Sequence, residues 1–188
     1  MSYIETISEA DASGELAEQF RRCRNPDGTV DNVIKMHSLN PESLRTHLDL
    51  YVAAMHRPSP LSRLEREMAA VVVSRLNGCT YCVQHHLKGL KKLMPDDRHR
   101  VADDLATGRL AKLSDREAAI VSYATKLTTN PHEMDHLDVQ HLREAGLDDR
   151  GVLDLAVVIG YFCYVNRLVK GLGVQLEGGK FEIGQWPT

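Results

Sequence analysis

The sequence predicts an all-α fold, and three observations lead to that prediction. Helix-capping residues recur ahead of apolar runs from about residue 40 onward. No stretch alternates apolar and polar residues with the period of two that marks a strand. The β-branched residues lie instead inside runs with a helical period, where they continue an apolar face. We therefore expect helices packed against helices around a common core.

Seven segments carry helix signals, and each is opened by a capping residue or closed by a glycine or proline. They are residues 41–56, 62–77, 79–94, 101–107, 114–128, 135–145 and 150–172. In the first, Pro41 takes the favoured first helical position. In the second, Ser62 and Glu65 form a capping box, and Gly78 stands where a C-cap glycine is usual.

The remaining helices follow the same rules. Pro95 stops the third helix, and Gly108 closes the short fourth one. Ser114 and Glu117 repeat the capping box seen in the second helix, so repeated helix-hairpin units are one interpretation of the chain. Shared capping rules alone could produce the same resemblance. Asp148 caps the long, apolar last helix.

Composition indicates an ordinary globular protein. The 188 residues are 43% hydrophobic and 26% charged, with a formal net charge of −3. We expect one domain over 1–188, with a core at about 40–130 and a C-terminal helical part at about 131–175. This charge gives no reason to expect nucleic acid or membrane as a partner. The longest apolar run, 155–165, is too short to span a bilayer, and no signal peptide is evident, so we expect a cytoplasmic protein.

Chemistry is most strongly indicated at Cys79 and Cys82, a C-x-x-C pair at a predicted helix start. The helix dipole and unpaired N–H groups there favour thiolate over thiol. A fall in thiol pKa from about 8.5 to about 7 would require roughly 2 kcal/mol. His86 lies four residues after Cys82 and therefore on the same helical face. His85 points about 100° away from His86.

Glu67 lies twelve residues before Cys79, on the preceding predicted helix. In an antiparallel hairpin that turns at Gly78, Glu67 and His86 lie roughly 16 and 12 Å from the turn, and so at nearly the same level. Small residues flank Glu67 and allow the neighbouring helix to approach closely. We expect a partly buried carboxylate with a raised pKa that accepts protons near neutral pH.

Other candidate residues have simpler interpretations. Cys163 lies inside the apolar run and is expected to be a small buried hydrophobe. Cys23 stands in a polar, basic stretch and is expected to be exposed. For Asn166 and Arg167 on the last helix, packing is the preferred interpretation and a functional role the alternative.

The spacing of Glu67, Cys79, Cys82 and His86 resembles the motif of AhpD-like alkylhydroperoxidases in the carboxymuconolactone decarboxylase superfamily. The tail, with Tyr161-Phe162, resembles the peroxidase-related branch. This resemblance implies an AhpD-like helical bundle built around a helix hairpin that carries the CxxC motif. It also implies homo-oligomers, from dimers up to hexamers.

The same resemblance implies a reaction. Cys82 would attack a hydroperoxide, and Cys79 would resolve the product into a disulfide. Glu67 and His86 would relay protons, and a dithiol reductant of unknown identity would complete the cycle. Some members carry a histidine between the cysteines where this chain has Tyr81, and a phenol is a poor base at neutral pH. The decarboxylase branch lacks the cysteine pair.

Two alternatives to an enzyme use the same residues. One is a metal-binding module formed by Cys79 and Cys82 with His85 or His86, although a zinc site usually takes four ligands. The other is a redox-sensing oligomeric module in which a disulfide controls assembly. The sequence has no glycine-rich phosphate loop and no flavin or nicotinamide motif, so we expect no organic cofactor and no metal.

Overall fold

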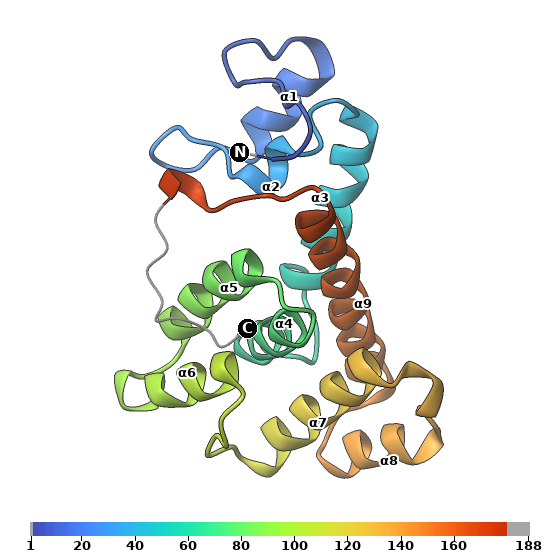
Figure 1. The fold of residues 1–188 in the computed structure, drawn as a ribbon. Coiled ribbons are helices and arrows are strands. Elements are labelled where there is room, and N and C mark those ends of the chain that lie inside the picture. The colour runs from blue at the N-terminus through green and yellow to red at the C-terminus, as the bar shows by residue number, and fades with distance from the viewer. Residues whose placement is uncertain (1, 180–188) are drawn as a thin grey trace. The chain divides into compact units, whose positions relative to one another are not determined.

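The computed structural model describes residues 2–179, which form α-helices, short 3₁₀ turns and loops (Figure 1). The α-helices are α1 (Gly14–Arg22), α2 (Asn32–Lys35), α3 (Pro41–Met55), α4 (Arg63–Leu76), α5 (Thr80–Leu93), α6 (His99–Thr107), α7 (Asp115–Thr129), α8 (His136–Glu144) and α9 (Asp149–Gly171). The 3₁₀ turns are η1 (Asp96–Arg98), η2 (Pro131–Glu133) and η3 (Glu177–Gly179). No β-strand occurs within residues 2–179, so the all-α prediction is confirmed.

The predicted helix starts from residue 40 onward are largely correct, and two earlier helices were missed. Ser62 with Glu65, and Ser114 with Glu117, both form reciprocal capping boxes. The missed helix α1 has a weak start signal, because the Ser13 side chain makes no cap hydrogen bond. The missed α2 has only four residues. Neither carries the capping pattern from which the other helices were predicted.

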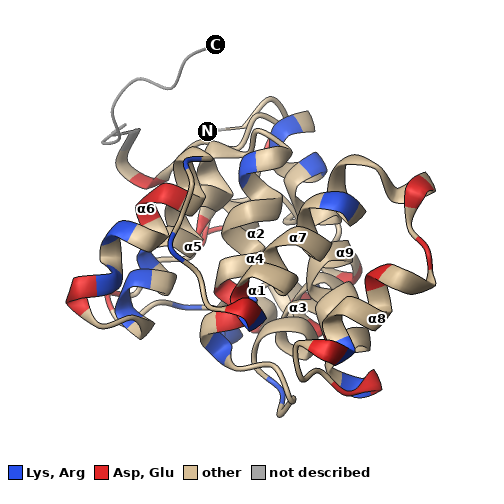
Figure 2. Cartoon of the chain, turned by 90° about the horizontal axis from the view of Figure 1, so that it is seen from below, with Lys and Arg blue, Asp and Glu red and all other residues tan. Residues whose placement is uncertain are grey.

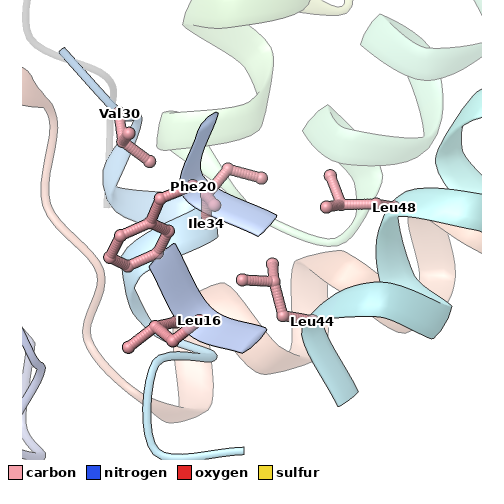
Figure 3. Close-up of a cluster of buried hydrophobic side chains, with 6 residues drawn as sticks. All are labelled: Leu16, Phe20, Val30, Ile34, Leu44 and Leu48. Atoms are coloured by element: carbon pink, nitrogen blue, oxygen red, sulfur yellow. The ribbon is translucent and has the colours of Figure 1, made fainter. Parts of the chain in front are cut away.

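By its internal contacts the chain divides into two compact units, Met1–Leu48 with Val169–Thr188, and Asp49–Leu168. The first unit has an apolar cluster of its own, drawn in Figure 3, to which α1, α2 and the first half of α3 contribute. Its buried members are Leu16, Phe20, Val30, Ile34, Leu44 and Leu48. Packing into this cluster explains why α1 and α2 are helical although their sequences carry no strong helix signal.

The second unit is organised around α4. This helix packs against α5, α6 and α7, and its most extensive partner is α5 (Figure 1). Every residue from Glu65 to Ser74 is buried, so α4 is enclosed on all sides rather than along one stripe. Charged groups on such a helix must find partners inside the protein, because burying an unpaired charge is costly.

Surface charges of both signs meet along the outer side of this unit. Lys91 of α5 pairs with Asp103 of α6 at 2.6 Å, and Figure 2 shows basic and acidic positions next to each other there. Helix α9 is long and apolar enough, with mean hydropathy 1.6 over 18 residues, to cross a membrane by length and composition alone. Half of that window is buried inside the protein, and core helices of soluble proteins meet the same criteria.

Candidate active site

The turn between α4 and α5 fixes the position of the first cysteine. Gly78 adopts φ +64°, and its N–H donates to the Arg75 carbonyl at 2.9 Å. The Cys79 N–H donates to the Ser74 carbonyl at 2.8 Å, which completes a Schellman motif. Cys79 is also the N-cap of α5. Its backbone therefore ends one helix and starts the next, and Cys82 follows in the first turn of α5.

The two cysteine sulfurs lie side by side in a nearly closed environment. Cys79 is 1% exposed and Cys82 is 4% exposed. The Cys79 thiol donates to the Cys82 sulfur at a distance of 2.7 Å. A disulfide bond is about 2.05 Å long, so a small movement would let these sulfurs bond. This arrangement suits a dithiol that cycles between reduced and oxidised forms.

The carboxylate of Glu67 meets the imidazole of His86 beside this pair. Glu67 Oε2 lies 2.6 Å from His86 Nδ1, so the two groups are at the same level of neighbouring helices, as their spacing in the sequence predicted. Because a carboxylate only accepts hydrogen bonds, we place a proton on Nδ1 of His86, which then donates to Glu67. The other nitrogen, Nε2, then remains available to accept a proton when the ring is neutral.

The predicted direction of the Glu67 pKa is wrong. Burial alone raises this pKa, as expected for a residue only 2% exposed. The hydrogen bond and charge of His86, together with those of Arg63, outweigh burial and lower the pKa below its ordinary value. Glu67 is therefore a carboxylate near neutral pH. It can orient His86 and stabilise its charge, but it is a poor proton acceptor itself.

The expected stabilisation of a Cys82 thiolate is also not found. The neighbouring Cys79 sulfur raises the pKa of the Cys82 thiol, and burial raises it further. The side chain of Asn166 acts in the opposite direction by hydrogen bonding to Cys82. In this closed arrangement Cys82 holds its proton, and the helix start does not ionise it by itself.

Asn166, for which packing was the preferred interpretation and a functional role the alternative, lies beside the cysteine pair. It is fully buried, and its Nδ2 donates to Ser74 Oγ at 3.2 Å. Its Oδ1 accepts from Asn77 Nδ2 at 3.0 Å. An asparagine inside an otherwise apolar helix was the available signal, since a buried amide needs partners. Here those partners are the end of α4 and the Cys82 sulfur.

Aromatic rings line the other side of His86. Phe162 and the imidazole pack edge to face with ring centroids 4.6 Å apart, and Tyr161 packs on Phe162 in the same way with centroids 5.1 Å apart. Tyr51 adds a third ring, 5.6 Å from Tyr161. His85 lies elsewhere and stacks on Tyr81 at 4.4 Å, so it does not share the position of His86. The predicted divergence of the two histidines is confirmed.

The remaining cysteines and Arg167 differ partly from expectation. Cys163 is only half-buried, and its sulfur lies 3.8 Å from Asn77 Nδ2. Cys23 is also half-buried and packs against the apolar cluster of the first unit, so it is not the exposed residue that was predicted. Arg167 is exposed, and its guanidinium donates to the Cys163 carbonyl.

The residues of the site do not assemble into a recognisable metal centre. Within residues 2–179 there is no group of three or more His, Cys, Asp or Glu side chains placed to hold a metal ion. The orientation of His85 toward Tyr81, and the pairing of His86 with Glu67, leave the two sulfurs without the additional ligands that a structural zinc site requires.

Comparison with known proteins bears on the whole chain and on this site. Residues 41–97, which include α3, α4, α5 and all four motif residues, match the carboxymuconolactone decarboxylase family. An uncharacterized peroxidase-related protein from Silicibacter sp. TM1040 is 31% identical in sequence, with a TM-score of 0.84. That match covers 94% of this chain and 92% of the other.

The chain belongs to the AhpD-like carboxymuconolactone decarboxylase superfamily. A second structure, the alkylhydroperoxidase AhpD core of a peroxidase-related protein from Ralstonia eutropha JMP134, is 26% identical with a TM-score of 0.85. It covers 94% of this chain and 93% of its own. The AhpD-like fold is thus shared along nearly the whole length.

Two further proteins are more distant in sequence. Debrominase Bmp8 shares the fold of this AhpD-like protein, with a TM-score of 0.76 and 18% identity over 93% of this chain and 91% of its own. An uncharacterized protein of Bacillus subtilis, YdfG, is 22% identical over 140 residues, which are 74% of this chain and 93% of YdfG. The matches to peroxidase-related proteins indicate peroxidase-related chemistry, and the particular reaction has to be argued from the site.

Proposed function

We propose that this AhpD-like protein is a thiol-dependent peroxidase that reduces hydroperoxides through a Cys79–Cys82 dithiol. The observation that carries this proposal is the placement of two sulfurs 2.7 Å apart at the start of α5, on the same hairpin as a carboxylate–imidazole pair 2.6 Å apart. A dithiol supplies two electrons, which is what the cleavage of one O–O bond requires.

The proposed cycle begins when Cys82 gives its proton to His86 and attacks the terminal oxygen of a hydroperoxide, ROOH. The O–O bond breaks, the alkoxide takes a proton and leaves as ROH, and Cys82 becomes a sulfenic acid. The Cys79 thiol then attacks the Cys82 sulfur, forming the disulfide and releasing water. One hydroperoxide and two thiols thus give an alcohol, water and a disulfide. An external dithiol reductant restores the starting state.

In this cycle His86 is the acid and base, and Glu67 holds it in place. The lowered pKa of Glu67 keeps its carboxylate charged, so it favours the imidazolium that forms when His86 takes the Cys82 proton. Asn166 assists by stabilising the charged form of Cys82. The Cys79 contact opposes this step, so we expect activation to require that the two sulfurs separate slightly when substrate binds.

The surroundings favour an organic hydroperoxide as substrate. Phe162, Tyr161 and Tyr51 form a chain of rings next to His86, and the first two are buried. Rings of this kind bury apolar groups and offer little to a small polar molecule. Hydrogen peroxide can interact only through hydrogen bonds, whereas an alkyl or aryl hydroperoxide could also make apolar contacts with these rings. We therefore propose the organic class.

Thiol counting tests the proposal. One equivalent of an organic hydroperoxide should remove two thiols and produce a Cys79–Cys82 cross-link, identified by peptide mass spectrometry. Cys82→Ser should lose peroxide consumption by at least about 1000-fold, the scale seen when a nucleophile is removed. Cys23→Ser is the matched control and should retain it. Consumption that survives in Cys82→Ser would overturn the proposal.

A further inference from the structure

Arg63 contacts the site although it lies outside the family motif. It is the first residue of α4, where a cation is disfavoured by the positive end of the helix dipole. Its side chain is 32% exposed and runs inward along the helix to Glu67, four residues on. Its Nε and Nη2 both donate to Glu67 Oε1, at 3.0 and 2.7 Å. The other carboxylate oxygen is the one that meets His86.

The guanidinium is itself fixed from outside α4. Its third nitrogen, Nη1, donates to the Met55 carbonyl at the end of α3, at 2.8 Å. The same nitrogen lies 2.9 Å from the ring of His56. On the far side, Gly89 of α5 brings backbone so close to Glu67 that a Cβ there would lie 3.3 Å from the carboxylate. Glu67 is thus held from three directions, and Arg63 brings a positive charge to Oε1.

We propose that Arg63 is a positioning residue of the thiol centre: it locks Glu67 against His86, and its charge sets the pH range in which His86 can accept a proton. This inference rests on the proposed function, because it assigns Arg63 a part in the same proton transfer. Arg63 acts through Glu67, since its guanidinium contacts Glu67, the Met55 carbonyl and His56 rather than the sulfurs. A fork of two hydrogen bonds fixes a carboxylate more rigidly than a single contact could.

The charge effect has a definite sign. The titratable groups around His86 are Glu67 and Arg63 on α4, His56 after α3, Cys82 with Cys79 at the start of α5, and Tyr161 on α9. Glu67 favours the imidazolium, and Arg63 opposes it. Neutralising Arg63 should therefore let His86 hold its proton to higher pH. Removing a charge that lies on the opposite oxygen of the shared carboxylate, in a partly buried site, should give a shift of about one pH unit.

Two substitutions separate charge from geometry. Arg63→Gln removes the charge, and Arg63→Lys keeps the charge but cannot form the fork. The readouts are the NMR titration of the His86 ring and the pH dependence of Cys82 alkylation by iodoacetamide, both measured on the full chain. Arg98→Gln is the matched control, because Arg98 makes a similar two-pronged contact with Glu117 on another helix.

The inference predicts that Arg63→Gln moves the His86 titration and the alkylation profile to higher pH by about one unit. Arg63→Lys should move both by less than half as much, and Arg98→Gln should move neither. An unchanged His86 titration in Arg63→Gln would overturn the inference, and so would equal shifts in both Arg63 variants. The His86 titration does not depend on peroxide turnover, so a failure of the proposed reaction would be visible separately as a wild-type protein that consumes no hydroperoxide.

Discussion

The protein places histidine in two contrasting environments. In the first unit, His37 and His47 face one another with ring centroids 4.6 Å apart, and both are buried. Burial, and to a lesser extent the charge of His37, lowers the pKa of His47 to about 4. In the second unit, His86 faces the carboxylate of Glu67, 2.6 Å away. One imidazole sits against a second imidazole, and the other sits against an anion.

The contrast shows which surroundings allow a histidine that is largely shielded from water to take up a proton. Moving imidazolium out of water is costly unless a negative charge compensates. Next to His37, protonation of His47 would put two potential cations together, so His47 stays neutral. Next to Glu67, an imidazolium at His86 would have a carboxylate 2.6 Å away to compensate its charge. The same side chain therefore contributes to packing in one unit and is assigned proton transfer only in the reaction proposed for the other.

The largest expected effect concerns the pH dependence of stability. His47 has a pKa of about 4 in the folded chain. In the unfolded chain it returns to about 6.5, so the unfolded state binds more protons between these values. Stability is then fully present above pH 6.5 and is lost as the pH falls toward 4. A difference of 2.5 pKa units corresponds to about 3 kcal/mol.

Urea denaturation at pH 7 and at pH 4.5 measures this loss. The carboxylates with lowered pKa values, such as Glu67 and Glu117, lose their contribution only below about pH 4.5, so the window above it reports on histidine. His47→Gln removes one titrating group and should reduce the difference between the two pH values. If wild type and His47→Gln lose the same free energy of unfolding, the assignment to His47 is wrong.

The second prediction concerns the carboxylate beside His86, the group that distinguishes its surroundings from those of His47. Glu67→Gln keeps the shape of the side chain and removes its charge, which leaves the Arg63 guanidinium without its anion. Breaking a buried ion pair in this way should lower the free energy of unfolding by about 2 to 3 kcal/mol. The His86 titration should move to lower pH, because no carboxylate then favours the imidazolium.

A second carboxylate–arginine pair provides the control. Glu117 accepts from both terminal nitrogens of Arg98 at 2.9 Å, but that arginine is 33% exposed and its partner 10%. Glutamine can still cap the helix at this position, and within residues 2–179 Glu117 pairs with Arg98 alone, whereas Glu67 contacts both Arg63 and His86. Glu117→Gln should therefore cost less than Glu67→Gln. Equal losses in the two variants would show that the second contact, from His86, does not make Glu67 the more important carboxylate for stability.

Local signals in the sequence predicted much of this structure. The capping boxes at Ser62 and Ser114 and the glycine at Gly78 depend on neighbouring residues, and all are present. The level of Glu67 relative to His86 follows from helix rise and a tight turn, and it too could be calculated. Such features need no knowledge of what the helices pack against.

The features that were predicted wrongly or missed depend on contacts between segments that are distant in the sequence. The direction of the Glu67 pKa is set by His86 and then by Arg63, whose position beside Oε1 depends on its anchoring to the end of α3. The part played by Asn166 depends on α9 packing against the end of α4. Helices α1 and α2 exist because they share an apolar cluster with α3. Tertiary contacts of this kind do not leave a periodic pattern in the sequence.

The smallest effect tests how tightly Glu67 is held next to His86. Alanine in place of glycine inside a helix should stabilise the protein by about 1 kcal/mol. At Gly160 of α9 no atom lies within 4 Å of an added Cβ, so Gly160→Ala should gain most of that amount. At Gly89 the new Cβ would lie 3.3 Å from Glu67 Cδ and Oε1, so the carboxylate must move by a few tenths of an ångström. Gly89→Ala should then gain little or nothing in urea denaturation, and the difference between the two variants measures the cost of moving Glu67. A gain at Gly89 equal to that at Gly160 would mean that the carboxylate is free to shift, in which case the close contact with His86 reflects no constraint from α5.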